Sequence, residues 1–326
     1  MESAMVKFNQ FFYELGCEIV EVTLTLFKIM IPVMLIMKVV EEMGGIDVIS
    51  RVLSPVMNMV GLPSETGIVW ATALLTNNYA GVAVLLNLGI SLTIAQASVL
   101  GSMILIAHSL PIEGAIAKKA GVSLWSTALL RLGGSVLFGW ILSQIYLYSG
   151  ALSQPAELIW QPEVVADPSW SVWLVEQAKS FALIAAVISV LMLVLKLLKM
   201  MGVEALIAVL LRPLFRILGI STESTNLTMI GVTLGISFGG GLLINEAEKG
   251  HIPAREVFTS VMLLNLLHSL IEDTLLILLI GADFYAIFWG RIVFSVLLVA
   301  IISAVVRNLD TKFCEKYIYR SVSNTI

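Results

Sequence analysis

The chain has 326 residues, of which 58% are hydrophobic and only 13% are charged. A soluble domain carries roughly 25% charged residues, so this composition excludes an ordinary cytoplasmic enzyme and indicates a polytopic membrane protein. The net charge of −4 provides no basic face, and no nucleic acid is expected as a partner. The two cysteines lie near opposite ends of the chain, which argues against a disulfide framework or a cysteine-based metal site.

Six segments are long and apolar enough to cross a lipid bilayer, which requires about 20 apolar residues. In chain order they are expected at residues 20–41, 93–112, 122–147, 174–197, 254–280 and 284–306. The segments 46–60 and 203–218 mix arginines with apolar residues, which predicts amphipathic helices that lie in the membrane interface. Residues 149–172 contain three prolines and three acids but no Lys or Arg, and we interpret them as an extracytoplasmic connector.

The two halves of the chain resemble each other. The matched positions, at an offset of 158 and then 160 residues, include Pro55 and Pro213, Gly61 and Gly219, Glu65 and Glu223, His108 and His268, Glu113 and Asp273, and Arg131 and Arg291. Two of the three histidines fall at one position of the repeat, which favours duplication over coincidence among Leu- and Val-rich helices. Residues 1–148 are therefore expected to form a first repeat, and residues 173–326 a second repeat with a basic cytoplasmic tail.

The distribution of Lys and Arg predicts the orientation, because cytoplasmic loops are enriched in these residues. When the connector 149–172 is placed outside and the basic tail inside, 13 of the 19 Lys and Arg residues fall inside. Both termini are then cytoplasmic, each repeat crosses the bilayer three times, and the second repeat is inverted relative to the first. The expected fold class is an all-α polytopic membrane protein built from two inverted-topology repeats.

Each repeat is also expected to contain a re-entrant helical hairpin. Residues 66–112 contain no charged residue and are too long for one span, so the chain must turn back within them. The turn is predicted at Thr76–Gly81 in the first hairpin, 66–90, and at Ser237–Gly241 in the second, 224–248. Non-helical backbone at this depth requires protein or a water-filled cavity around it, and inverted hairpins at the midplane are typical of secondary transporters.

The candidate substrate-binding residues are the polar side chains and glycines of the two turns and a repeat-matched pair of asparagines: Thr76, Asn77, Asn78, Asn87, Ser237, Gly239, Gly240 and Asn245. Amides buried among apolar residues need partners, because desolvating them costs several kcal/mol. They are suited to bind a neutral polar solute. The alternative is that they cap the half-helices or join neighbouring helices.

A second candidate group, for a coupling proton, a sodium ion or another cation, lies near the ends of two spans: His108, Ser109, Glu113, His268, Ser269, Glu272 and Asp273. An ionisable side chain within a span is costly, and this makes it a functional hypothesis by default. A histidine beside a carboxylate can form a proton relay or an ion site. His268 and Glu272 are four residues apart, which predicts that they share one helix face. The alternative is that Arg131 and Arg291 neutralise the acids in buried structural bridges.

The paired segments PVMNMVGLPSETGIVWATALLTNNYAG and PLFRILGISTESTNLTMIGVTLGISFGGG resemble the gate, or nucleoside-recognition, domain. Such domains occur in bacterial inner-membrane proteins related to the spore maturation proteins, and similar segments occur in concentrative nucleoside transporters and ferrous-iron transporters. The resemblance covers residues 25–145 and 183–305 and rests on helix lengths, glycines and a few polar positions. It implies a multi-pass protein of the bacterial inner membrane that transports nucleosides or similar solutes.

Three functions stay open at this point. The first is a secondary transporter of a small polar, nucleoside-like solute with proton or sodium coupling; the second is a cation transporter or channel; the third is a scaffold without transport activity. A midplane cavity of roughly 300 Å³ or more would favour an organic solute, and a tight imidazole- and oxygen-lined site would favour an ion. A dry centre in which every acid is bridged to Arg would favour the scaffold.

The sequence lacks the motifs of hydrolases, of phosphate loops and of dinucleotide-binding turns. We therefore expect that the protein is not an enzyme. No cofactor is expected apart from the coupling ion, H+ or Na+. The expected partners are the lipid bilayer, a small solute or ion, and a second copy of the chain in a homo-oligomer.

Overall fold

The computed structural model describes residues 2–158, 169–235, 241–246, 249 and 252–320. Most of these residues are helical, and the β-type pairings among them are two isolated bridges. Six described segments are apolar and long enough to cross a membrane, and each overlaps one of the six expected spans: Gln10–Glu42, Ile94–Lys119, Leu124–Ser149, Trp170–Met200, Ala254–Leu278 and Tyr285–Asn308. The prediction of an all-α fold with six candidate spans is confirmed for the described residues.

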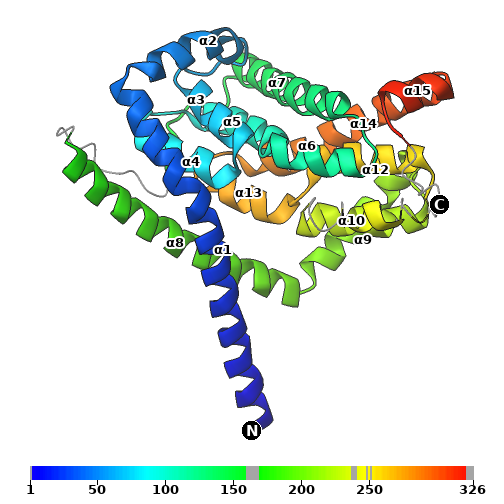
Figure 1. Ribbon diagram of the computed structural model, residues 1–326, viewed down its shortest axis with the longest axis horizontal. Helices are drawn as coiled ribbons and strands as arrows, with labels where there is room; N and C mark the ends of the chain where they lie inside the picture. Colours follow the sequence, from blue (N-terminus) through cyan, green and yellow to red (C-terminus); the bar gives the residue numbers. More distant parts are fainter. Residues whose placement is uncertain (1, 159–168, 236–240, 247–248, 250–251, 321–326) are drawn as a thin grey trace.

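The helices of the first half are α1 (Glu2–Glu42), α2 (Gly45–Met59), α3 (Thr66–Leu75), α4 (Asn78–Leu88), α5 (Ile94–Ala107), α6 (Leu110–Lys119) and α7 (Leu124–Ser149). Those of the second half are α8 (Trp170–Met200), α9 (Val203–Ile217), α10 (Thr222–Leu234), α12 (Ala254–Leu267), α13 (Leu270–Leu278), the π-helix η1 (Tyr285–Gly290), α14 (Arg291–Asn308) and α15 (Thr311–Tyr317). Figure 1 shows their arrangement.

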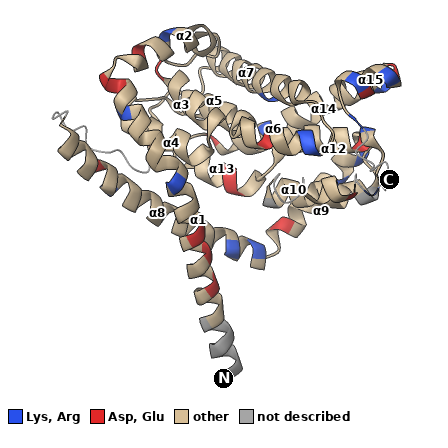
Figure 2. Cartoon of the chain, in the orientation of Figure 1, with Lys and Arg blue, Asp and Glu red and all other residues tan. Residues whose placement is uncertain are grey.

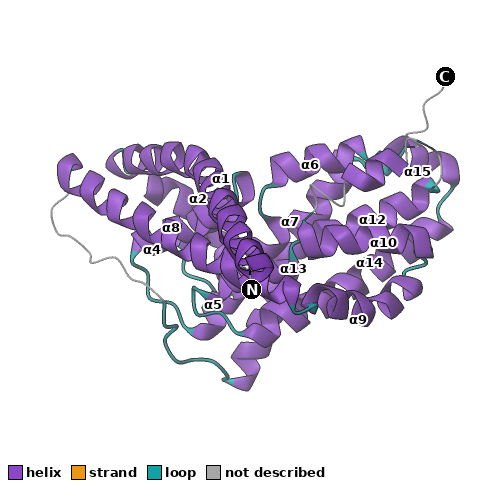
Figure 3. Cartoon of the chain, turned by 90° about the horizontal axis from the view of Figure 1, so that it is seen from below, coloured by secondary structure: helices purple, strands orange, loops and turns teal. Residues whose placement is uncertain are grey.

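The order of elements in the second half follows that of the first. A long helix, α1 or α8, is followed by a 15-residue helix, α2 or α9, which begins after a left-handed glycine, Gly44 or Gly202. Helices α5 and α12 have 14 residues each, and a short helix, α6 or α13, begins three residues after each of them ends. The amphipathic helices α2 and α9 lie at opposite ends of the bundle (Figures 1 and 3).

The centre and the periphery of the bundle differ in burial. Within an apolar stretch of 18 residues, only 11% is buried in Gln10–Glu42 and in Trp170–Met200. The buried share is 67% in Ile94–Lys119 and 72% in Ala254–Leu278. Helices α1 and α8 cross at the periphery (Figure 1), where Lys196 Nζ lies 3.1 Å from Glu18. Charged residues are frequent on α1, α2, α15 and the junction of α8 with α9, whereas α3, α4 and α5 carry none (Figure 2). The few charges of the centre therefore need an explanation.

The helix of the first predicted hairpin is interrupted at the expected turn, between α3 and α4. Asn77 is extended, with φ −162° and ψ 170°, and its side chain accepts a hydrogen bond from the Ala80 amide. A Cβ at Gly81 would lie 2.7 Å from the Cβ of Ala73, so glycine is needed where α4 packs on α3. The sequence therefore places the interruption correctly.

Two of the spans are interrupted as well, at matched positions. His108 follows α5 with an extended backbone, and Ser109 then takes a left-handed conformation with φ 50°. Between α12 and α13, His268 is likewise extended and Ser269 is left-handed, with φ 47°. The extended backbone of His108 ends α5, because the following amide, that of Ser109, points away from the helix and donates to the Ala73 carbonyl oxygen. We call these two interruptions the first and the second break.

Candidate functional site

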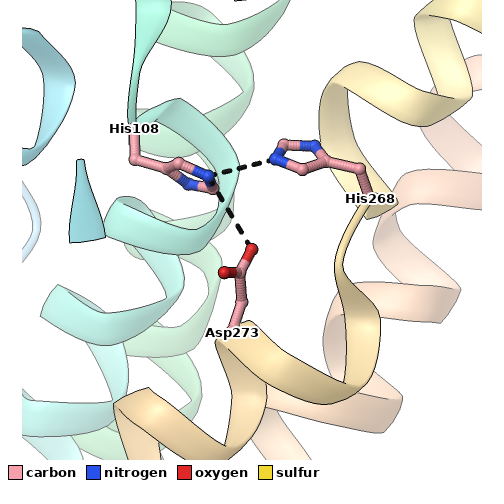
Figure 4. A group of neighbouring side chains, drawn as sticks. All are labelled: His108, His268 and Asp273. Carbon is pink, nitrogen blue, oxygen red and sulfur yellow. Dashed lines mark hydrogen bonds and ion pairs between the residues drawn. The ribbon is translucent and has the colours of Figure 1, made fainter. Parts of the chain in front are cut away.

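The two breaks meet in the middle of the bundle, where they bring the repeat-matched histidines together. The Nε2 atoms of His108 and His268 are 3.0 Å apart, and the ring centroids are 4.9 Å apart. Both side chains are buried. Figure 4 shows the two rings approaching each other from separate helices, with the carboxylate of Asp273 beside the ring of His108.

The second nitrogen of each ring identifies the tautomer. Nδ1 of His108 lies 3.1 Å from the carbonyl oxygen of Ile104, and Nδ1 of His268 lies 2.7 Å from that of Leu264. A carbonyl oxygen only accepts, so both Nδ1 atoms carry the proton and donate it. Both Nε2 atoms of the neutral rings then present lone pairs to each other at 3.0 Å. Such a contact is repulsive unless a proton or another cation lies between the two nitrogens.

Two carboxylates also face the histidine pair. Glu113 Oε1 lies 3.3 Å from Nε2 of His108 and 3.2 Å from Nε2 of His268, and Asp273 Oδ2 lies 3.7 Å from Nε2 of His108. Both acids are buried. Four atoms with lone pairs therefore converge on one small volume, which we call the histidine–carboxylate cluster: His108, His268, Glu113 and Asp273.

The helix dipoles explain why these residue types stand at the breaks. Each histidine follows the last residue of a helix, α5 or α12, where the exposed carbonyls carry a partial negative charge and favour a cation. Glu113 and Asp273 lie in the first turns of α6 and α13, where the free amides favour an anion. The same helix ends thus stabilise the carboxylates and a cation held between them.

The repeat-matched arginines hold the backbone of the breaks. Arg131, which is fully buried, donates to the carbonyl oxygen of His108 and pairs with Glu113 Oε2. Arg291, also fully buried, donates to the carbonyl oxygen of His268 at 2.9 Å. Within the described residues Arg291 forms no ion pair with Asp273. The hypothesis of two structural bridges is therefore right for the first acid and wrong for the second.

Asp273 has instead a partner from the first hairpin. Its Oδ1 accepts a hydrogen bond of 2.8 Å from the Asn78 amide, while its Oδ2 has no hydrogen-bond partner among the described residues. The neighbouring Tyr79 donates to Glu272 at 3.2 Å. Sequence reasoning placed Tyr79 in the turn but not among the candidate site residues, because nothing in the sequence pairs it with an acid 193 residues away.

The turn of the first hairpin also contacts the first break. The Ser109 hydroxyl donates to the Thr76 carbonyl oxygen at 2.7 Å, and the Ser109 amide donates to the Ala73 carbonyl oxygen at 2.9 Å. The Thr76 hydroxyl donates to the Thr72 carbonyl oxygen at 2.6 Å. Since the turn touches Ser109 and, through Asn78, Asp273, it lies against both breaks.

The remaining predicted residues do not join the cluster. Asn77 caps α4, and Asn87 accepts a hydrogen bond of 2.6 Å from Gln177, which joins α4 to α8 as in the helix-joining alternative. Asn245 is exposed. The three other candidates of the second hairpin lie outside the described residues: Ser237, Gly239 and Gly240.

The prediction that His268 and Glu272 share a helix face is wrong. The two residues lie on opposite sides of the second break, because His268 follows α12 and Glu272 belongs to α13. The left-handed Ser269 turns the chain between them. Spacing of four residues brings side chains together only in a continuous helix, and no proline marks the second break in the way that Pro111 marks the first.

The atoms of the cluster are closely spaced. A cavity of about 50 Å³ adjoins Tyr79 between α4, α8 and α13, and one of about 430 Å³ lies elsewhere, between Lys118 and the residues of α15. In the cluster itself, the nitrogen and oxygen atoms are already 3.0 to 3.7 Å apart. This spacing suits a single ion and leaves no room for an organic solute between them.

The comparisons with known proteins are consistent with a membrane protein. No family model matches the chain, and no solved structure matches it. The chain is 27% identical over 283 residues to the uncharacterized membrane protein YvoD of Bacillus subtilis (strain 168), and the match covers 85% of this chain and 89% of that relative. Six apolar helices and a membrane-protein relative establish a membrane protein.

Proposed function

We propose that this protein carries a cation across the membrane and that the cation binds between His108 and His268. One observation carries the proposal: two Nε2 atoms 3.0 Å apart, with both Nδ1 atoms directed at carbonyl oxygens. A neutral imidazole pair in this arrangement needs a positive charge between its rings. The two breaks that hold the pair interrupt buried spans, where an ionisable group is costly and is retained for function.

The contacts of the cluster favour a cation over the other two functions. A scaffold would bridge each buried acid to an arginine, but Asp273 has no such bridge within the described residues. An organic solute would need a cavity at the first turn, but there the Asn78 amide is already bonded to Asp273. A tight group of imidazole nitrogens and carboxylate oxygens is what a bound ion requires.

The arrangement of the halves supports transport by alternating access. We infer that the two halves are inverted in a bacterial inner membrane, with α3 and α4 as a re-entrant hairpin from the outer side. The amphipathic helices α2 and α9, at opposite ends of the bundle, then lie in opposite interfaces (Figure 3). Each half contributes one break to the cluster, so a shift of one half against the other exposes the cation to one side.

The test is a flux assay with the purified full chain in liposomes that contain dyes for protons, sodium and divalent metals. We expect one cation gradient to dissipate with the parent protein, and His108→Ala and His268→Ala to reduce the rate to that of empty liposomes. Asn245→Ala, a change at an exposed candidate of the other site, is the control and should keep the rate. Equal cation flux in the histidine variants, or uptake of labelled uridine without any cation flux, would overturn the proposal.

A further inference from the structure

We propose that the cation is a divalent transition-metal ion, bound by Nε2 of His108, Nε2 of His268 and Oδ2 of Asp273, with Glu113 Oε1 as a fourth donor. This inference rests on the proposed function and names its substrate class. The ligand atoms of His108, His268 and Asp273 all lie within 4.8 Å of one another. Figure 4 shows them directed at a common point.

The histidines are prepared for a metal. A metal-bound imidazole usually donates its other N–H to a carbonyl oxygen or a carboxylate, which fixes the ring and leaves one nitrogen for the ion. Both rings do this here, through the carbonyl oxygens of Ile104 and Leu264. The helix carbonyls thus orient His108 and His268 so that each offers Nε2 as a ligand without a change of tautomer.

The spacing of the donors fits one small ion. Bonds of 2.0–2.2 Å from nitrogen or oxygen to a tetrahedral metal place neighbouring donor atoms roughly 3.3 Å apart. The Nε2 atoms are 3.0 Å apart, Glu113 Oε1 lies 3.2 and 3.3 Å from them, and Asp273 Oδ2 lies 3.7 Å from His108. The ligand atoms of His108, His268 and Asp273 all lie within 4.8 Å of one another, so these side chains have to draw together around the ion.

The unpartnered oxygen of Asp273 is a second, independent observation. Asp273 is 6% exposed, and Oδ2 lacks a hydrogen bond among the described residues although Oδ1 is bonded to Asn78. A buried carboxylate oxygen without a partner is costly. A metal ion between Oδ2 and the two imidazoles satisfies it, and the bond from Asn78 then orients the ligand in the manner of an outer-shell partner.

The donor set selects the class of metal. Imidazole nitrogen together with carboxylate oxygen suits Zn²⁺, Fe²⁺, Mn²⁺, Co²⁺ and Ni²⁺. Ca²⁺ and Mg²⁺ require oxygen ligands, and Cu⁺ prefers sulfur. The cluster contains neither a full oxygen shell nor a cysteine, since the two cysteines, Cys17 and Cys314, lie in α1 and α15.

The experiment measures metal binding to the purified, metal-free full chain by competition with a chelating dye. We expect one Zn²⁺ or Co²⁺ per chain, no competition from a large excess of Ca²⁺ or Mg²⁺, and a Co²⁺ absorption spectrum of a four-coordinate nitrogen–oxygen site. His268→Gln and Asp273→Asn should weaken binding by more than about 100-fold, beyond the loss typical of outer-shell partners. Glu272→Gln, a change of the neighbouring acid in the same helix turn, is the matched control and should cost less than about 10-fold.

The Co²⁺ spectrum is recorded on the parent chain, so the test does not depend on the folding of a variant. Absence of stoichiometric binding, or equal affinity in His268→Gln, Asp273→Asn and the parent, would overturn the inference. Proton or sodium flux without metal binding would overturn the inference and leave the proposed function standing. Metal binding without any cation flux would support the metal site and overturn the proposed function.

Discussion

The two breaks have the same backbone conformation but differ in the partners of their acids. At the first break, Glu113 is paired with the buried Arg131. At the second, Asp273 accepts a hydrogen bond from the Asn78 amide, and within the described residues Arg291 donates to the backbone carbonyls of Leu266 and His268 and to no acid. In each break a buried arginine donates to the carbonyl oxygen of the histidine. The ion pair is found only at the first break among the described residues, so Glu113 is held by an arginine while Asp273 keeps an oxygen without a hydrogen-bond partner.

The largest expected difference between the breaks is in stability. Glu113→Gln leaves the guanidinium of Arg131 buried without its counter-charge, and breaking a buried pair in this way costs about 3–5 kcal/mol. Asp273→Asn removes no arginine partner and should cost less than about 1 kcal/mol. The free energy of unfolding in mixed detergent micelles measures both. Equal losses would mean that the two acids are held alike.

The next effect concerns the histidines, in which the breaks should be equivalent. His108→Gln and His268→Gln each remove one imidazole ligand, and we expect each to weaken Zn²⁺ binding by more than about 100-fold. The two losses should agree within about threefold, because the rings make matching contacts through Nδ1 and Nε2. Competition with a chelating dye measures both affinities. A loss of Zn²⁺ affinity in only one of the two variants would mean that the ion is bound by one half of the chain alone.

A smaller effect should follow from the contact between the first hairpin and the second break. Asn78→Ala removes the hydrogen bond of 2.8 Å to Asp273 Oδ1 and leaves a second oxygen of that acid without a partner. We expect Zn²⁺ affinity to fall about 10-fold and stability to fall by about 1–3 kcal/mol. Asn87→Ala, which removes an asparagine bonded to α8 instead, should leave the affinity unchanged. The same titration compares the two variants.

The smallest expected effect separates the two left-handed serines. Ser269→Gly relieves left-handed strain of about 1 kcal/mol, but glycine adds a similar entropy to the unfolded chain, so stability should change by less than about 0.5 kcal/mol. Ser109→Gly also removes the hydroxyl that donates to Thr76, and it should lower stability by about 1 kcal/mol. Unfolding titrations measure the stability of both variants. A larger loss of stability in Ser269→Gly than in Ser109→Gly would contradict this expectation.

The sequence predicts the spans well but the site only in part. Runs of apolar residues locate all six candidate spans, and the polar run around Asn77 locates the interruption between α3 and α4. Repeat matching selects both histidines and both acids of the cluster. The partner of Asp273 could not be predicted, because Asn78 lies 195 residues away along the chain and the repeat suggests Arg291 instead.

By itself, the sequence determined that the chain enters a bilayer, how many times it is able to cross, and which ionisable side chains remain inside. These properties depend on hydrophobicity summed over neighbouring residues, which is local along the chain. Pro111 marks the first break in the sequence, but only the tertiary structure decided that the chain also breaks at His268 and that the two rings meet. A broken helix frees backbone groups that other elements must bind, here Arg131, Arg291 and the carbonyl of Ala73.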